Sequence, residues 1–170
     1  ESANKKVRLE VTKGKFEDVD IKNVINKIHD ADIEVMANYI YGLPGDTKET
    51  IEETFELSLD LCTSGWNTYA AMALPGSLLY KEAVEQDIEL PKNYRGYSFH
   101  GYETVCLPTE KLKNWEILKM RDEDFIKYHT NSFFLDRIEK KFGVKQKNNI
   151  LEMTKIKLKR KIVEENFHDE

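Results

Sequence analysis

The sequence predicts an α/β fold with parallel strands, followed by a helical C-terminal extension. Two nearly uncharged runs, residues 33–41 and 66–74, are rich in β-branched and aromatic residues, which is typical of buried strands. A Leu-Pro-Gly turn closes each run and precedes a helix signal, and the two leucines, Leu43 and Leu74, are 31 residues apart. Because about 30 residues make one strand-helix unit, successive units of this kind pair their strands in parallel through right-handed crossovers.

The helices beside these strands are predicted from apolar spacing and from capping residues. Four residues before the first strand fall at the spacing i, i+3, i+4 and i+7, which predicts an amphipathic helix over residues 18–30. Asp46, with Glu49 three residues later, has the pattern of a capping box and predicts the start of the helix between the strands. Ser77 predicts the N-cap of a short helix through Glu85. The four spaced residues are Ile21, Val24, Ile25 and Ile28.

The second half of the chain has a different organisation. Residues 86–108 lack a clear period and are rich in aromatic residues, and a third strand over 102–107 is an alternative interpretation. One helix is predicted over 109–130, starting at a threonine cap, and another over 131–142, closed by a glycine. A last helix is predicted over 147–165. These patterns indicate a helical extension rather than further strand-helix units.

The chain therefore divides into three parts. Residues 1–85 form the strand-helix part, residues 86–108 an aromatic-rich connecting segment, and residues 109–170 the helical extension. Two parallel strands bury little apolar surface and leave edges exposed, so residues 1–85 need more strands than the chain supplies. The chain begins at Glu1 rather than at a methionine. We therefore expect a processed product or a piece of a longer protein.

Composition and charge exclude several classes of protein. The 170 residues carry a net charge of −5, which argues against a general nucleic-acid binder. The two cysteines, Cys62 and Cys106, are 44 residues apart. That spacing excludes a disulfide scaffold and a cysteine-rich metal site carried by this chain alone. No run approaches about 20 apolar residues, so we expect no transmembrane segment. Together these features predict a cytoplasmic protein.

The basic residues are concentrated in the C-terminal extension. Residues 137–162 carry ten Lys or Arg against two Glu, a net charge of +8. One interpretation is a helix that binds an anionic partner such as RNA or a lipid headgroup. The other is a solvated helical face, which is the usual role of a charge run. No aromatic residues alternate with these lysines, so the segment offers no stacking platform for single-stranded nucleic acid.

The two Leu-Pro-Gly turns are expected at the same end of the sheet, where α/β folds bind ligands. Residues 42–46 could form a ligand cradle, because glycine lets the backbone approach a ligand and the next helix presents its first N–H groups. The alternative is a plain turn from strand to helix. The aromatic residues over 94–102 either cover this end or pack the extension onto the sheet.

Three segments, taken in order, resemble the C-terminal half of a radical S-adenosylmethionine enzyme. They are residues 1–2, 39–47 and 73–80. Members of that family carry Gly-Ile-Glu-Ser after the fourth barrel strand and Gly-Leu-Pro-Gly-Glu-Thr after the fifth. Pro-Gly-Thr or Pro-Gly-Ser, with a following Leu-Tyr, comes after the sixth. Each motif alone is weak, but the ordered set over residues 1–85 is fairly specific. Residues 99–142 are also similar to the extension of the branch that carries a cobalamin-binding domain.

The resemblance implies a partial (βα)6 TIM-like barrel, of which this chain holds the last two or three units. It implies a [4Fe-4S] cluster that reductively cleaves S-adenosylmethionine to a 5′-deoxyadenosyl radical and starts radical chemistry on an unknown substrate. The family's cluster ligands form a Cys-x3-Cys-x2-Cys loop after the first strand. The metal ligands and any cobalamin domain would then lie upstream, and this chain alone is expected to be inactive. The implied partners are the upstream half of the same barrel and an electron donor such as flavodoxin or ferredoxin.

The resemblance also assigns residues to the cofactor, although it assigns no catalytic residue. Glu1 and Ser2 would face the ribose and the methionine part of S-adenosylmethionine. Ile40 and residues 42–44 would line the adenine through apolar contact and backbone, and residues 73–75 would offer backbone hydrogen bonds to the adenine edge. The implied cofactor-binding residues are Glu1, Ser2, Ile40, Gly42, Leu43, Pro44, Ala73, Leu74 and Pro75.

Two other functions compete with this interpretation. One is a stand-alone α/β module that binds a nucleotide-like ligand, and it would bind S-adenosylmethionine without iron. The other is a non-catalytic interaction protein that uses the basic C-terminal helix. Its binding to RNA or anionic vesicles would depend strongly on salt and would be lost on removing residues 144–170.

Overall fold

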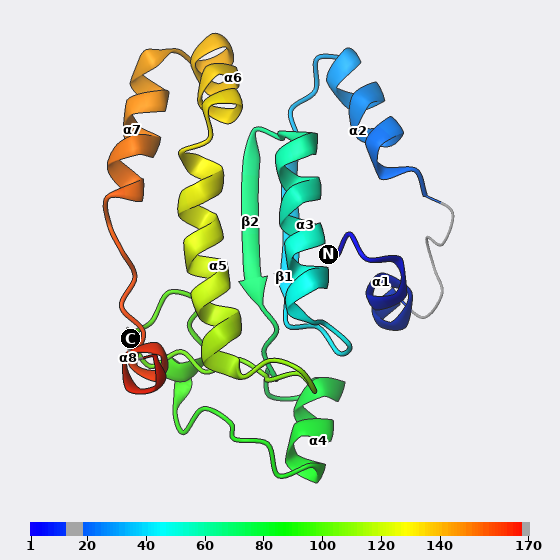
Figure 1. Ribbon diagram of the computed structural model, residues 1–170, viewed down its shortest axis with the longest axis vertical. Helices are drawn as coiled ribbons and strands as arrows, with labels where there is room; N and C mark the ends of the chain where they lie inside the picture. The colour runs from blue at the N-terminus through cyan, green and yellow to red at the C-terminus, as the bar shows by residue number, and fades with distance from the viewer. Residues whose placement is uncertain (13–18, 168–170) are drawn as a thin grey trace.

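The computed structural model describes residues 1–12 and 19–167, and over these ranges the chain is a mixed α/β fold (Figure 1). Two strands, β1 (Met36–Tyr41) and β2 (Gly65–Ala70), pair in parallel over their whole length. Helix α3 (Lys48–Leu61) joins them. The predicted α/β class with parallel strands is therefore confirmed in this coarse form.

The rest of the described chain is mostly helical. The remaining helices are α1 (Lys5–Thr12), α2 (Ile21–Asp30), α4 (Leu78–Glu85), α5 (Asn114–His129), α6 (Ser132–Phe142), α7 (Val144–Thr154) and α8 (Lys161–Asn166), with a 3-10 turn at Tyr94–Tyr97. In Figure 1, α5 runs alongside β2 and α3 lies in front of β1. Helix α4 lies beyond the carboxyl ends of the strands, whereas α6 lies beyond the opposite end.

One face of the sheet is buried under α3 and α5. Tyr39 of β1 and Trp66 of β2 lie on this face, and the Trp66 ring stacks on Tyr128 of α5 with 5.3 Å between ring centroids. Nearer the carboxyl ends of the strands, Tyr41 packs with Ile51 of α3. Burial of these large side chains stabilises the sheet by removing apolar surface from water.

Within the described part of the chain, the opposite face of the sheet is open near the amino ends of the strands, whereas Tyr69 and Ile40 nearer the carboxyl ends are partly covered. Alternate residues of a strand point to opposite faces. On this side Met36 is 62% exposed, Asn38 is exposed and Ile40 is half-buried. Asn67 of β2 donates a side-chain hydrogen bond to Asn38 at 3.1 Å. The prediction of buried strands is thus confirmed for one face of the sheet and wrong for the other.

The two edges of the sheet also differ. At the edge of β2, the Arg121 guanidinium of α5 donates from Nε to the Thr68 carbonyl at 2.8 Å, so α5 covers this edge. At the edge of β1, the Ile40 N–H donates to the Glu1 carbonyl at 2.9 Å. No other strand within the described ranges pairs with β1 on that side. The edge of β1 is therefore open from its amino end up to Ile40.

Several predicted helix ends are confirmed. Ser77 caps α4 and Asn131 caps α6, each through its side chain, and α6 ends at Gly143. Helix α2 ends at Asp30 as predicted, but it begins at Ile21, after its N-cap Asp20, rather than at residue 18. Residue 18, the first of the helix predicted over 18–30, lies outside the described residues. The apolar stripe of α2 is the exception to the predicted packing, because none of its residues is buried.

Two further predicted helix starts are wrong by one to a few residues. Helix α3 is capped by Thr47, whose hydroxyl accepts from the Thr50 N–H. Asp46 is not the cap because its carboxylate binds the turn before it. Helix α5 begins at Asn114 rather than near Thr109. The Thr109 hydroxyl organises a separate turn and donates to the Asp46 carbonyl at 2.9 Å, so the helix cannot start there.

The predicted C-terminal helix over 147–165 is interrupted. Residues 155–160 are irregular between α7 and α8. Arg160 is 2% exposed, and its guanidinium donates to both carboxylate oxygens of Asp122 on α5, at 2.8 and 3.0 Å. Arg160 has an extended backbone and is the N-cap of α8, whereas α7 already ends at Thr154. The prediction of one continuous helix over 147–165 is therefore wrong. The alternative strand over 102–107 does not form either.

Asp124 of α5 is a buried carboxylate next to the sheet. It accepts a hydrogen bond from the Tyr41 hydroxyl at 3.0 Å and from the Lys127 ammonium at 3.0 Å. Burial raises its pKa above the ordinary value of 3.8. Ionisation of Asp124 therefore opposes folding. Its contribution to stability is full below the ordinary pKa and is lost as pH rises through the raised pKa.

We expect Asp124→Asn to unfold with a free energy within about 1.5 kcal/mol of the original chain at neutral pH, since the amide oxygen still accepts from Tyr41 and carries no charge. Denaturant unfolding at several pH values checks this. The original chain should lose stability relative to the variant as pH rises above about 4. Asp124→Ala should cost about 1–3 kcal/mol at every pH, because the Tyr41 hydroxyl loses its acceptor. A gap between the original chain and Asp124→Asn that does not change with pH would contradict the raised pKa.

Candidate functional site

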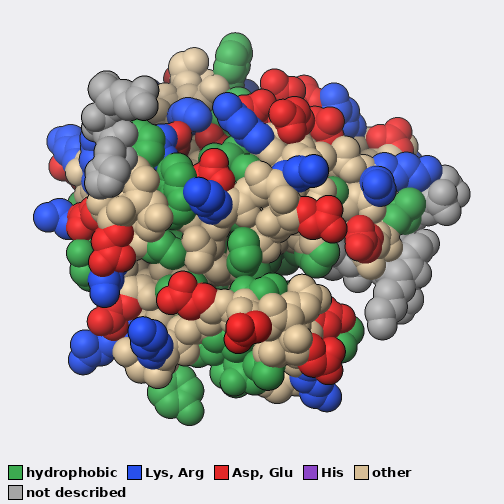
Figure 2. All heavy atoms as spheres, turned by 60° about the horizontal axis from the view of Figure 1, so that its bottom comes forward, with side chains coloured by type: hydrophobic (Ala, Val, Ile, Leu, Met, Phe, Trp, Pro, Cys, Tyr) green, Lys and Arg blue, Asp and Glu red, His purple; other side chains and the backbone are tan. Residues whose placement is uncertain are grey.

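A cavity of about 560 Å³ lies at the carboxyl ends of the two strands. The turn after β1, α1, α4 and residues 107–110 bound it, and we call it the mouth cavity. Figure 2 turns this end toward the viewer and shows a hollow in which hydrophobic side chains are exposed among charged ones. Glu10, Glu82, Glu110 and Lys6 line the mouth cavity. It lies at the end of the sheet where the sequence predicts ligand binding.

Asp46 fixes the turn that follows β1. Its carboxylate accepts from the N–H groups of Gly42 and Leu43, at 3.0 and 2.9 Å, and from the Thr50 hydroxyl at 2.7 Å. Asp46 is 2% exposed, and burial raises the pKa of its carboxyl. Gly42 and Gly45 have φ angles of +79° and +84°, which favour glycine. The buried Asp46 carboxylate therefore stabilises the turn, although the sequence suggested Asp46 only as a helix cap.

These bonds change what the turn can offer to a ligand. The N–H groups of Gly42 and Leu43 donate to Asp46, so these two residues offer no free backbone N–H group to a ligand, which favours the alternative of a plain turn. The Leu43 side chain is 4% exposed and packs with Val7 and Ala71. Gly42 and Pro44 do line the mouth cavity. The turn can thus contribute apolar surface and carbonyl oxygens rather than anion-binding N–H groups.

The second Leu-Pro-Gly turn presents its middle residues to solvent. Ala73 is 3% exposed and packs with Ala83 of α4. Leu74 is 46% exposed and Pro75 is exposed. Gly76 has a φ angle of +90°, which lets the chain reverse into α4. Leu74 and Pro75 therefore remain accessible at the carboxyl end of β2, whereas Ala73 is part of the core.

Ser2 does not face the mouth cavity. Its side chain is 4% exposed, and its hydroxyl lies 3.4 Å from the Thr54 hydroxyl of α3. The Ala3 N–H donates to the same Thr54 oxygen at 3.0 Å. The Ser2 side chain is therefore occupied by α3, and the contact of Ser2 with a cofactor stays a prediction. Glu1 is exposed, and Ile40 lies half-buried on the open face of the sheet.

The aromatic segment mainly packs the connecting segment and the extension. Phe99 packs on Tyr69 of the open face with 4.8 Å between ring centroids. The Tyr102 hydroxyl donates to the Glu164 carboxylate of α8 at 2.9 Å. Tyr94 is 89% exposed and does not line the mouth cavity. These contacts support the packing interpretation for Phe99 and Tyr102.

Cys62 and Cys106 are free thiols, and neither belongs to a group of potential metal ligands among the residues that the structure describes. Burial raises the pKa of the Cys106 thiol to about 12, and burial also raises the pKa of the Cys62 thiol. In the ranges that the structure describes, no group of three or more His, Cys, Asp and Glu side chains could hold a metal ion.

Among the residues that the structure describes, no helix has the length and apolar character needed to cross a membrane.

Comparison of the chain with protein-family models and with curated proteins finds no match. The fold and the mouth cavity therefore define only the structural class of this protein, not a family. The chain is a mixed α/β protein with two parallel strands among its described residues and a candidate ligand site at their carboxyl ends.

Gly42→Ala and Gly76→Ala form a matched pair that tests the first turn. Both glycines have a positive φ, so each alanine carries about 1–2 kcal/mol of backbone strain. An added Cβ at Gly42 would lie 2.9 Å from Cδ1 of the buried Ile117, whereas nothing lies within 4 Å at Gly76. Because crowding adds about 1–3 kcal/mol at Gly42 only, we expect Gly42→Ala to be the less stable variant by that amount in denaturant unfolding. Equal losses would show that the turn relaxes freely.

Proposed function

We propose that this chain is the C-terminal part of a radical S-adenosylmethionine enzyme barrel and that an upstream half carries its [4Fe-4S] cluster. One observation carries the proposal. Helices α3 and α5 cover one face of the sheet, and Arg121 covers the edge of β2. The edge of β1 and the part of the other face that bears Met36 and Asn38 are exposed.

A further parallel strand fits this open edge. Parallel sheets normally bury both faces, and a two-stranded parallel sheet is marginal alone. The Ile40 N–H already donates to the Glu1 carbonyl. Because the backbone groups of alternate residues face the same edge, those of Met36 and Asn38 face it too. A strand leading into Glu1 would pair with them and would place Glu1 at its carboxyl end, beside the mouth cavity.

Fewer residues of this chain are available to bind a cofactor than the sequence suggested. Gly42 and Pro44 line the mouth cavity and can give apolar contact and carbonyl oxygens, and Ile40 packs behind this turn with Val7 and Leu43. Leu74 and Pro75 are accessible on the second turn, outside the lining of this cavity. These features suit a purine, which needs an apolar slot with a few backbone acceptors for its amino group. The cluster supplies the reductive cleavage of S-adenosylmethionine when it is bound. The chain's own residues would position the cofactor and keep water out.

The remaining parts of the proposal lie outside this chain. They are an upstream Cys-x3-Cys-x2-Cys loop, an electron donor such as flavodoxin or ferredoxin, and, in the cobalamin branch, an upstream cobalamin domain. We place the parent protein in the cytoplasm, where cysteine ligands stay reduced.

The test is anaerobic reconstitution of the full-length gene product with iron and sulfide. We expect visible absorbance of a [4Fe-4S] cluster and release of 5′-deoxyadenosine from S-adenosylmethionine under reduction. A gene product without the upstream three-cysteine loop, or a reconstituted protein that releases no 5′-deoxyadenosine, would overturn the proposal.

A matched pair of variants tests the site within this chain. Leu74, 46% exposed at the second turn, and Leu78, 61% exposed on α4, are four residues apart. The proposal places the cofactor against the exposed Leu74, which lies outside the lining of the mouth cavity. Leu74→Asp should then weaken binding of S-adenosylmethionine by about tenfold or more, because a charge replaces an apolar contact. Leu78→Asp should leave binding unchanged. Equal effects of the two variants would remove Leu74 from the site.

A further inference from the structure

A second cavity, of about 590 Å³, lies between α5 and the chain over residues 153–164. We call it the extension cavity, and it shares no lining residue with the mouth cavity. Its volume falls within the range of about 300–1,000 Å³ that small-molecule sites occupy. Its apolar wall consists of Phe125, Ile126, Met153, Ile156, Leu158 and Val163.

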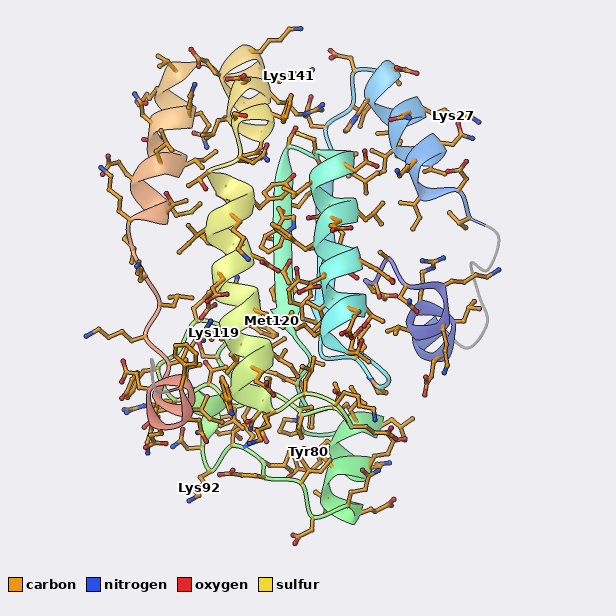
Figure 3. The ribbon with its side chains drawn as sticks, in the orientation of Figure 1. Lys27, Tyr80, Lys92, Lys119, Met120 and Lys141 are labelled. Atoms are coloured by element: carbon orange, nitrogen blue, oxygen red, sulfur yellow. The ribbon has the colours of Figure 1, made fainter. Side chains whose placement is uncertain are left out.

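Buried polar contacts build one wall of the extension cavity. Residues 155–160 run beside α5 from α7 to α8 (Figure 3). Arg160 anchors this segment through its two bonds to Asp122 and a bond to the Thr104 hydroxyl at 3.0 Å. Yet Ile156, within the same segment, is 73% exposed. A wall that is firmly held but exposes large apolar side chains is a feature of binding surfaces rather than of a frayed tail.

The charges around the extension cavity are unequal. Lys157 and Lys159 line it, and among the residues that the structure describes neither forms an ion pair with a carboxylate. The acidic residues of the cavity have partners already. Asp122 and Glu123 are each paired with a basic side chain, and Glu164 accepts from a tyrosine hydroxyl. The cavity therefore combines an apolar wall with two uncompensated ammonium groups.

We propose that the extension cavity binds a single-chain amphipathic anion, with its aliphatic chain on the apolar wall and its carboxylate at Lys157 and Lys159. The two ammonium groups can donate charge-assisted hydrogen bonds to one carboxylate. Each methylene that reaches the wall should strengthen binding by up to about fourfold. A single-stranded nucleic acid fits less well, because no exposed aromatic rings alternate with the lysines for bases to stack on. The inference does not rest on the proposed function, since the two cavities are separate.

Calorimetric titration of the full-length protein with dodecanoate, below its micelle concentration, tests this site. We expect saturable binding, weaker for decanoate by up to about fifteenfold because two methylenes are missing. Dodecyltrimethylammonium has the same chain with the opposite charge and should bind about tenfold more weakly or not at all. Lys157→Glu combined with Lys159→Glu should weaken dodecanoate binding by about tenfold or more. These lysines are exposed, so the variant should fold.

The control variant is Lys140→Glu combined with Lys145→Glu. It makes the same charge change at exposed residues that do not line the cavity, and it should leave binding unchanged. Equal weakening by both variants, equal binding of both surfactants, or no saturable binding overturns the proposal. Binding of phosphatidylglycerol vesicles without binding of dodecanoate also overturns it and assigns the surface to a membrane.

Discussion

Replacing Arg160 with methionine is expected to lower the free energy of unfolding by about 3 kcal/mol. Besides Asp122, the buried guanidinium donates to the Gly101 carbonyl at 3.1 Å and to the Thr104 hydroxyl. Methionine keeps much of the side-chain volume but donates no hydrogen bond, so it leaves these acceptors without their partner. Asp122 would retain only its contact with Arg121. Guanidinium denaturation, compared by midpoint and slope, measures the loss.

The neighbouring lysine provides the control for Arg160. Lys161→Met removes the same charge from a side chain that is 56% exposed, and it should cost less than about 0.5 kcal/mol. A double-mutant cycle with Asp122→Asn isolates the ion pair, for which we expect a coupling energy of about 1–3 kcal/mol. If the two single losses simply add, the Arg160–Asp122 pair does not hold the extension.

Local information in the sequence was sufficient for most of the elements and for their order, but not for α1, which was not predicted, or for the break between α7 and α8. The N-caps Ser77 and Asn131 act on the next turn of their own helices, so a few residues decide where α4 and α6 begin. The two uncharged runs decide the strands in the same way, because β-branched and aromatic residues favour extended backbone. Parallel pairing follows from the helix between them, since a crossover returns the chain in the same direction.

The sequence could not give the roles of residues whose partners are distant in the chain. Arg160 belongs to a charge run of the kind that is usually solvated, and its partner Asp122 is 38 residues away. Ser2 belongs to a motif that resembles a cofactor contact, but Thr54, 52 residues away, binds its side chain. In both cases a contact between separate elements decides the burial of the side chain. The motif at the first turn correctly located Gly42 and Pro44 at the mouth cavity, yet it did not reveal that Asp46 occupies two N–H groups there.

Asp46→Ala is expected to cost about 3 kcal/mol of folding free energy and to loosen the turn that borders the mouth cavity. Alanine leaves the N–H groups of Gly42 and Leu43 without their acceptor, whereas the Thr50 hydroxyl keeps the Thr47 carbonyl at 3.1 Å as an acceptor. Asp46→Asn should cost about 1 kcal/mol, because one amide oxygen can still accept from the two N–H groups. Thermal and denaturant unfolding measure both losses, and hydrogen exchange at the Gly42 and Leu43 amides reports the loosening directly.

The pH dependence of the Asp46 variants separates the role of the acceptor from that of the charge. Burial raises the pKa of Asp46, so its contribution to stability is lost as pH rises through that value, whereas Asp46→Asn does not titrate. The gap between the original chain and Asp46→Asn should therefore shrink as pH rises, while Asp46→Ala remains far less stable throughout. Glu49→Ala, at an exposed acidic residue in the first turn of α3, should cost under about 1 kcal/mol. If Asp46→Ala lowered the free energy of unfolding no more than Glu49→Ala does, the turn after β1 would keep its shape without Asp46. The N–H groups of Gly42 and Leu43 would then be available to a ligand.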